Sequence, residues 1–110
     1  MDMANEKHVV VFITAETLGQ CREIADALVG GKLAACVNIV PKVQSKFRWQ
    51  GKIDSANESL LIVKTREALL DKVIASVKSI HSYKVPEIIA LPIVGGNSDY
   101  LDWIDEVTLD

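Results

Sequence analysis

Apolar residues along the chain switch between the two-residue period of a strand and the three-to-four-residue period of a helix. Residues 8–14 form a β-branched and aromatic run, which predicts a buried strand. Residues 16–32 predict an amphipathic helix that begins at a capping box, Thr17 and Gln20, and ends at the left-handed glycine pair 30–31. The apolar stripe of this helix consists of Cys21, Ile24, Ala25, Leu28 and Val29.

A long, bent β-hairpin is predicted over residues 33–65. Its first strand, residues 32–41, is expected to end at Pro41, because proline lacks the N–H that a central ladder needs. Residues 42–54 then alternate, which predicts one face in water. The two sides of this segment are Val43, Ser45, Phe47 and Trp49 on one and Lys42, Gln44, Lys46 and Arg48 on the other. Residues 50–52 predict the bend that returns the chain to the sheet.

Residues 66–81 predict a second helix capped by Thr65, and residues 86–94 predict a further strand. The apolar stripe of the second helix ends in a histidine and consists of Leu70, Val73, Ile74, Val77 and His81. Residues 97–110 predict a short third helix capped by Ser98. Its packing residues are expected to be Tyr100, Leu101, Ile104 and Val107.

The predicted order is strand, helix, strand, strand, helix, strand and a terminal helix. This order is the α+β ferredoxin-like βαββαβ arrangement, an antiparallel sheet with helices on one face. The strands are unusually apolar for a sheet that is half in water, and a hairpin longer than its domain offers an edge to a neighbour. We therefore expect oligomerisation to cover the remaining surface.

Length and composition favour one packed domain. The chain has 110 residues, 49% hydrophobic and 25% charged, so we expect a single domain over residues 1–110 in which residues 1–7 are a flexible N-terminus. The net charge of −3 argues against nucleic acid as a partner, because counterion release from phosphates needs concentrated Lys and Arg. Small molecules, ions and proteins remain as partners.

The longest early apolar run is residues 9–13, which is too short for a signal-peptide core or a membrane span. We therefore expect a cytoplasmic protein with no membrane partner. The two cysteines, Cys21 and Cys36, agree with a reducing compartment and have neither metal nor redox spacing.

The sequence contains no recognisable catalytic frame. Neither His8 nor His81 accompanies a nucleophile motif, and core packing is the favoured role of both cysteines. His81, at the end of a predicted helix, is either a partner of the helix dipole or a metal ligand. Lys64 and Arg66 flank a junction of strand and helix, which offers N–H groups and two cations to an anion, although surface ion pairing is the simpler role.

Several separate stretches together point to a family. They are GKLAACVNIVP at 31–41, RWQGKI at 48–53, LIVKT at 61–65, HSYKVPEIIALPI at 81–93 and GNSDYLDWI at 96–104. In order and spacing they resemble the CutA divalent-cation tolerance proteins, over nearly the whole chain from Val9 to Val107. The resemblance implies a tight homotrimer of ferredoxin-like protomers, similar in build to the PII signalling proteins. It also implies a link to tolerance of copper and other divalent ions, with no established enzymatic reaction.

The resemblance implies one candidate metal contact. A copper site proposed for the family uses a first-strand cysteine and two adjacent histidines at the end of the second helix. The matching positions here are Ile13 and the pair Ile80-His81, so only His81 retains a ligand atom. The family block HPYE is HSYK here, where Lys84 puts a cation in place of a possible oxygen ligand. We therefore expect weak binding of Cu²⁺ or another divalent cation at His81, with Glu87 or groups of another subunit.

The resemblance also implies a candidate pocket between subunits. The matching residues in it are Lys64, Tyr83, Glu87, Trp49 and Trp103. They would stack rings on a small anionic metabolite and bind its charge, although anchoring the interface is the favoured role.

The predicted function is thus metal-ion tolerance, and a PII-like effector-binding trimer is the alternative. A scaffold role would need only the trimer. A hydrolase of the acylphosphatase kind is set aside, because no arginine follows the first strand before Arg22.

Overall fold

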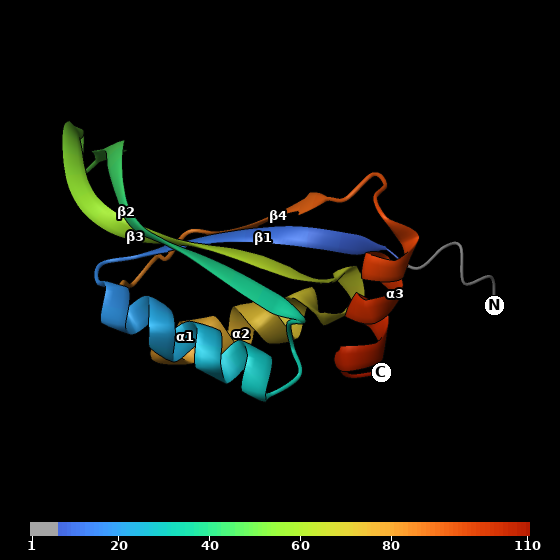
Figure 1. The fold of residues 1–110 in the computed structure, drawn as a ribbon. Coiled ribbons are helices and arrows are strands. Elements are labelled where there is room, and N and C mark those ends of the chain that lie inside the picture. Colours follow the sequence, from blue (N-terminus) through green and yellow to red (C-terminus); the bar gives the residue numbers. More distant parts are fainter. Residues whose placement is uncertain (1–6) are drawn as a thin grey trace.

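The computed structural model describes residues 7–110, so the predicted flexible N-terminus over residues 1–7 lies, apart from Lys7, outside the described residues. The elements in chain order are β1 (His8–Ala15), α1 (Leu18–Gly30), β2 (Cys36–Trp49), β3 (Lys52–Arg66), a short 3₁₀ helix η2 (Glu67–Leu69), α2 (Leu70–Ile80), β4 (Ile88–Pro92) and α3 (Ser98–Val107) (Figure 1). This is an α+β fold in the predicted βαββαβ order with a C-terminal helix, which confirms that part of the prediction.

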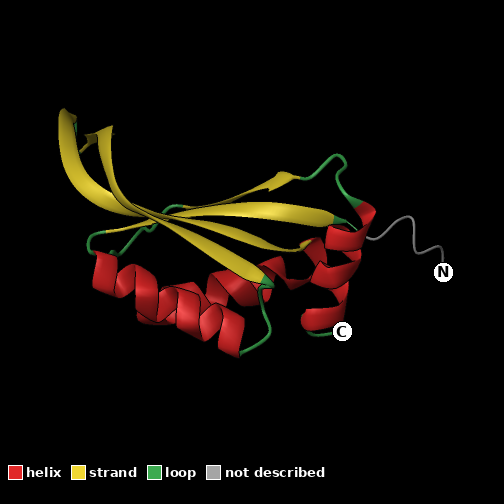
Figure 2. Cartoon of the chain, in the orientation of Figure 1, coloured by secondary structure: helices red, strands yellow, loops and turns green. Residues whose placement is uncertain are grey.

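The strands form one antiparallel sheet in the order β2-β3-β1-β4, with β2 and β4 at its edges. Helices α1 and α2 lie side by side against one face of this sheet, and α3 lies across the end where β1 begins (Figures 1 and 2). The other face, which we call the far face, carries no helix from the described part of the chain. Its residues, from the strand registers, include Val10, Phe12, Cys36, Asn38, Leu60, Ile62, Lys64, Ile89 and Leu91.

The core lies between the sheet and the two packed helices. Alternate strand residues and one stripe of each helix are buried there, among them Val9, Val11, Ile13, Leu61, Val63, Cys21, Ile24, Leu28, Val73 and Val77. These positions match the predicted periods, because alternate strand side chains share a face and helical residues three and four apart share a stripe. Val29, predicted in the stripe, is instead 45% exposed, since it lies at the margin of the stripe next to Leu28.

The far face is mostly apolar, with Asn38 and Lys64 as its polar members, and no helix covers it in the protomer. Phe12 and Ile62 are half-buried there, while Ile89 and Leu91 on the edge strand β4 are 52% and 44% exposed. Isolated apolar side chains on a surface are ordinary, but a sheet face on which most side chains are apolar indicates an interaction surface.

The β2–β3 hairpin is continuous, which corrects the prediction that a strand ends at Pro41. A register shift between Val40 and Val43 places one extra residue in β2, which is a β-bulge. The bulge accommodates the proline, and because β2 is an edge strand, the missing N–H of Pro41 does not interrupt hydrogen bonding in the centre of the sheet. The predicted turn is confirmed: Gln50 and Gly51 have φ values of 50° and 79°, the two positive angles of a type I′ hairpin turn.

Three predicted helix ends are wrong by one to several residues. The left-handed residue after α1 is Lys32, with φ of 59°, whereas Gly31 has φ of −84°. Thr65 does not cap α2, because it is still in β3 and its hydroxyl donates to the Leu33 carbonyl at 2.6 Å. Ser98 is already helical, and the Asn97 side chain caps α3 by accepting from the Asp99 N–H at 3.0 Å. The Thr17 cap of α1 is confirmed, since its hydroxyl accepts from the Gln20 N–H at 3.1 Å.

Candidate functional site

His81 follows the last turn of α2 and is 9% exposed. Its Nδ1 accepts from the Tyr83 N–H at 3.0 Å, so its Nε2 carries the proton and donates to the Thr14 carbonyl at 2.7 Å. The neutral ring therefore joins the end of α2 to β1, with both nitrogens bonded to backbone groups. A metal ion could bind this imidazole only by replacing one of these two bonds.

The other matching positions of the family copper site add no ligand. Ile13 is fully buried against the helices, and Ile80 ends α2 beside His81. No group of three or more His, Cys, Asp or Glu side chains within residues 7–110 could hold a metal ion. Any metal contact of His81 would thus need groups from another copy of the chain.

Tyr83 and Glu58 form a partly buried polar contact next to His81. The Tyr83 hydroxyl donates to Glu58 Oε2 at 2.9 Å, and the Tyr83 ring lies 4.9 Å from the His81 ring between centroids. Burial is the main cause that raises the pKa of Tyr83 to about 12, followed by the hydrogen bond and the charge of Glu58. Glu58 itself is 8% exposed, whereas sequence patterns treat a lone acid at a strand as solvated. Glu87, expected beside Tyr83 in the pocket, is exposed just before β4.

A second polar cluster lies near the C-terminal end of β3. Lys64 is paired with Cys36 across β3 and β2, and its Nζ lies 4.0 Å from Cys36 Sγ. Burial, followed by the neighbouring Cys36 thiol, raises the pKa of Tyr100. The Tyr100 ring lies 5.4 Å from the Trp103 ring, and both rings are over a third exposed, so Tyr100 does not pack in the core as predicted.

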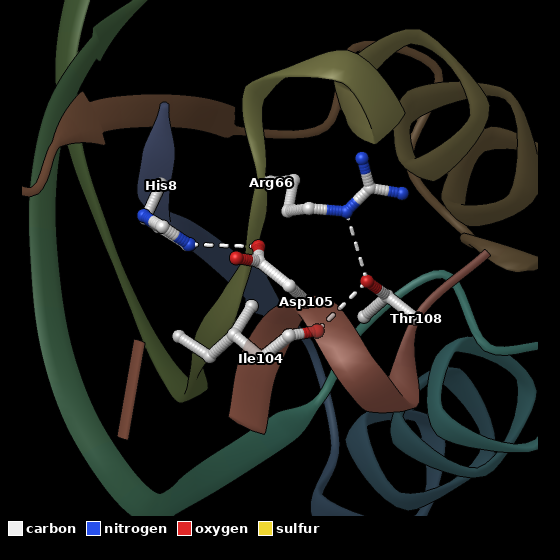
Figure 3. A network of polar contacts seen from close by, with 5 residues as sticks. All are labelled: His8, Arg66, Ile104, Asp105 and Thr108. Carbon is white, nitrogen blue, oxygen red and sulfur yellow. Dashed lines mark hydrogen bonds and ion pairs between the residues drawn. The ribbon is translucent and has the colours of Figure 1, made fainter. Parts of the chain in front are cut away.

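Helix α3, which carries these two rings, is anchored by polar contacts shown in Figure 3. His8 Nε2 donates to Asp105 Oδ1 at 2.8 Å, and Arg66 Nε donates to Thr108 Oγ1 at 3.0 Å. Thr108 in turn donates to the Ile104 carbonyl at 2.8 Å. Because His8 and Asp105, and likewise Arg66 and Thr108, are far apart in sequence, no local pattern predicts these two contacts.

The five predicted pocket residues do not meet within one protomer. Lys64 and Trp103 belong to the cluster around Cys36, while Tyr83 bonds to Glu58, six residues back along β3 and therefore about 20 Å away. Trp49, at the hairpin turn, is a similar distance farther along and 51% exposed. The pocket thus stays a prediction that requires a second copy of the chain.

The structure also has a cleft that sequence patterns did not indicate. It has a volume of about 890 Å³ and lies between the start of β1, the end of β4 and the side of α3 that carries Leu101 and Asp105, with His8, Leu70 and Ile93 also in its lining. It contains none of the predicted site residues. Separately, none of the helices within residues 7–110 has the length and apolarity needed to cross a membrane.

Comparison with known proteins identifies close relatives. Residues 9–107 match the family model of the CutA1 divalent ion tolerance protein. Over 100 residues the chain is 48% identical to the chloroplastic protein CutA 1 of Oryza sativa subsp. japonica, covering 91% of this chain and 56% of the relative. Over 99 residues it is 52% identical to the divalent-cation tolerance protein CutA of Thermus thermophilus, covering 90% and 96%. The chain thus spans little more than half of the plant relative and almost all of the bacterial one.

Solved structures agree with this similarity. The crystal structure of CutA1 from Oryza sativa superposes with a TM-score of 0.92 at 46% identity, covering 94% of this chain and 95% of that one. The divalent cation tolerance protein from Thermus thermophilus superposes with a TM-score of 0.90 at 50% identity, covering 92% and 98%.

Proposed function

Because the chain belongs to the CutA1 divalent ion tolerance protein family, we propose that it acts in the response of the cell to divalent cations, copper among them. We propose that it does so as a homotrimer and without catalysing a reaction. The family match over residues 9–107 is the observation that carries this proposal. A strain in which the gene is deleted should lose tolerance to added copper salt and recover it with the gene restored; unchanged growth would count against the function.

The trimer is supported by the far face and by charge. An apolar sheet face with Ile89 and Leu91 half-exposed is better buried against another copy than left in water. The outer hairpin, residues 42–57, is basic, with Lys42, Lys46, Arg48 and Lys52 against one acid, Asp54. Helix α3 is acidic and has no basic residue, with Asp99, Asp102, Asp105 and Glu106. Opposite charges on two distant parts of one protomer suit a cyclic assembly in which each hairpin reaches the next copy.

An obligate interface of this kind buries on the order of 1,000 Å² or more per subunit. Dissociation should then accompany unfolding, so the melting temperature should rise with protein concentration. A melting temperature independent of concentration, together with a monomer mass by light scattering, would contradict the trimer.

The metal proposal centres on His81. Its imidazole is the one remaining ligand of the family site, and a cation bound there would have to compete with the Tyr83 N–H or the Thr14 carbonyl. Binding of Cu²⁺ is therefore expected to be weak and to depend on His81. Titration calorimetry with Cu²⁺ would compare wild type with His81→Gln, which keeps a donor for Thr14, and with the control His8→Gln. Identical isotherms for wild type and His81→Gln would exclude His81 as the ligand.

The alternative function is a PII-like trimer that binds a small anionic metabolite between subunits. The observation that favours it is the Lys64 ammonium 4.0 Å from Cys36 Sγ, because Cys36 also neighbours Tyr100, whose half-exposed ring is paired with that of Trp103. A thermal-shift screen of anionic metabolites against wild type and Lys64→Gln would test it. A ligand that stabilises only wild type would support it, and the absence of any stabilising ligand would count against it.

We propose a cytoplasmic location on the basis of the unpaired thiols of Cys21 and Cys36. Cell fractionation with an antibody to the protein should recover it with cytosolic markers. Recovery in an organellar or periplasmic fraction would overturn this location.

A further inference from the structure

Two groups of exposed aromatic side chains lie at opposite ends of the protomer. Phe47 and Trp49, near the tip of the outer hairpin, are 40% and 51% exposed. Tyr100 and Trp103 on α3 are 41% and 38% exposed, and their ring centroids lie 5.4 Å apart. Figure 1 shows the hairpin tip and α3 at the two ends of the sheet. Large rings exposed in this way indicate protein–protein contacts, because Trp and Tyr are enriched there.

Both ring groups border the far face. The strand register pairs Trp49 with Lys52, which lies an even number of residues along β3 from the far-face residue Lys64. Side chains an even number of residues apart share one face of a strand, so Trp49 continues the far face into the hairpin. Tyr100 neighbours Cys36, at the other end of the same face. A second copy that covers the far face therefore approaches both groups.

Charges of opposite sign border the two ring groups. Lys52 is the cross-strand neighbour of Trp49. On α3, Asp99 lies four residues before Trp103 and Glu106 three residues after it, so the three share one stripe of the helix. Lys52, Asp99 and Glu106 are exposed, and none forms an ion pair with another residue of the described range 7–110. The hairpin tip and α3 thus complement each other in charge, and both present aromatic rings.

The two ring groups cannot meet within one protomer. Strand β3 runs from Lys52 at the hairpin tip to the region of Lys64 near α3, a distance on the order of 40 Å for an extended strand. The partner of each group must therefore be another molecule, and a second copy of the chain carries the complementary group. Such a contact joins unlike surfaces, so it repeats around a ring and closes with three copies when each is rotated by a third of a turn.

We propose that α3 is the docking surface for the hairpin tip of the next copy. Trp49 of one copy packs against the Tyr100 and Trp103 rings of the next, and Lys52 lies against the acidic stripe of Asp99 and Glu106. This inference rests on the proposed homotrimer and deepens it by naming the surface that each hairpin contacts. Each copy gives one hairpin tip and receives one, so the three contacts of the ring are identical.

A short bis-maleimide crosslinker tests this contact on the native protein. Lys52→Cys and Glu106→Cys are introduced together in a Cys36→Ala chain, while Cys21 is fully buried and out of reach of the reagent. The distance along β3 prevents a link within one protomer, so every link between positions 52 and 106 joins two copies. We expect linked dimers and trimers on a denaturing gel, with mass spectrometry locating the link at these two positions.

The matched control moves the second thiol to another exposed acid. Glu23→Cys on α1 replaces Glu106→Cys, and Lys52→Cys and Cys36→Ala stay as before. Because α1 lies on the helical side of the sheet, away from the far face, this chain should give no linked species above background (Figure 2). Equal linking in the two proteins would mean that the reagent reports chance encounters, and it would overturn the docking surface.

Tryptophan fluorescence gives a second readout that needs no new thiol. The chain has two tryptophans, so Trp103→Phe leaves Trp49 as the only indole and keeps a ring at position 103. In this background, Asp99→Lys with Glu106→Lys should release the hairpin and make acrylamide quench Trp49 at least about twofold more efficiently, since a ring that leaves an interface returns to water. Adding Lys52→Glu should lower the quenching again, because opposite charges then face each other in reverse.

Asp71→Lys on α2, in the same Trp103→Phe background, is the control for a reversed charge and should leave the quenching of Trp49 unchanged. Light scattering separates the docking surface from the trimer itself. A trimer in which positions 52 and 106 do not link, or in which Trp49 is quenched as freely as N-acetyltryptophanamide, would overturn the docking surface and leave the homotrimer standing. A monomer mass for the wild-type protein would overturn both.

Discussion

Glu58 accepts a 2.9 Å hydrogen bond from the Tyr83 hydroxyl, and this contact ties the loop after α2 to the middle of β3. His81 lies against the Tyr83 ring and bonds to β1 through Thr14. The loop that leads from α2 to β4 is therefore held on both inner strands of the sheet. A ligand that binds at His81 or Tyr83 would therefore meet a loop whose position is already fixed by these hydrogen bonds.

The first prediction concerns ionisation of Tyr83. The chain has two tyrosines, so Tyr100→Phe leaves Tyr83 as the only phenol, and its absorbance should titrate near pH 12 instead of 10. Because the folded-state pKa is above the unfolded value, the contribution of this group to stability is complete below about pH 10 and is lost as pH rises toward 12. Adding Glu58→Gln should lower the midpoint without returning it to 10, since burial is the largest cause. A midpoint near 10 with Glu58 present would contradict the buried contact.

The second prediction concerns the bonds of His81. Truncation in His81→Ala leaves the Thr14 carbonyl and the Tyr83 N–H without their partner, which should lower the free energy of unfolding by about 1–3 kcal/mol. Denaturant titration would measure the change. Ser79→Ala, two residues away and exposed, is the control and should cost less than about 0.5 kcal/mol. Equal stability of the two variants would mean that His81 has no structural role.

The third prediction concerns the hairpin turn. Gly51 has φ of 79° with nothing near its missing Cβ, so Gly51→Ala should destabilise the protein through backbone strain alone, by about 1 kcal/mol. Gly95 also has open space but no positive φ, so Gly95→Ala is the matched control and should be neutral or slightly stabilising. Thermal melts of both variants would decide the point. A neutral Gly51→Ala would rule out the type I′ turn.

The fourth prediction concerns the far face. Ile89→Asp places a charge on the exposed edge strand β4, where it should block assembly of three copies and leave the protomer core intact. Light scattering would follow the mass, and circular dichroism the fold. Val85→Asp, at a 71% exposed loop residue, is the control and should remain trimeric. Assembly of Ile89→Asp like that of wild type would remove the far face from the interface.

The parts of the fold that followed from sequence are those set by local periodicity. The stripe of α1 appears as predicted at Cys21, Ile24 and Leu28, because residues three and four apart in sequence point to the same side of a helix. The end of a strand at Pro41 was wrong, because a bulge lets proline remain inside an edge strand and nothing local reveals it. The cap at Thr65 was wrong for a similar reason: its hydroxyl bonds to Leu33, a partner that only the folded sheet brings near.

The site depends more strongly on tertiary contacts. His81 lies at the end of α2 as predicted and its role as a metal ligand stays a prediction, while its two hydrogen bonds join it to Thr14 and to the loop that follows it. The Cys36 cluster was missed because a cysteine inside an apolar strand has the pattern of a packing residue, and only the register opposite Lys64 shows otherwise. The register between two strands leaves no periodic pattern in the sequence. The contacts of Cys36 with Lys64 and of Tyr83 with Glu58 could therefore not be predicted from it.

The central position of β1 has a consequence for synthesis of the chain. β1 is made first, yet its two neighbours, β3 and β4, come from residues 52–66 and 88–92. The apolar strand around Val11 therefore leaves the ribosome with neither edge paired, and its second edge can pair only after residues 88–92 have been made. A nascent chain stalled before Ile88 would expose the edge of β1 that β4 later covers, with its backbone N–H and C=O groups unpaired. We expect chaperones to bind the β1 segment at this stage of translation.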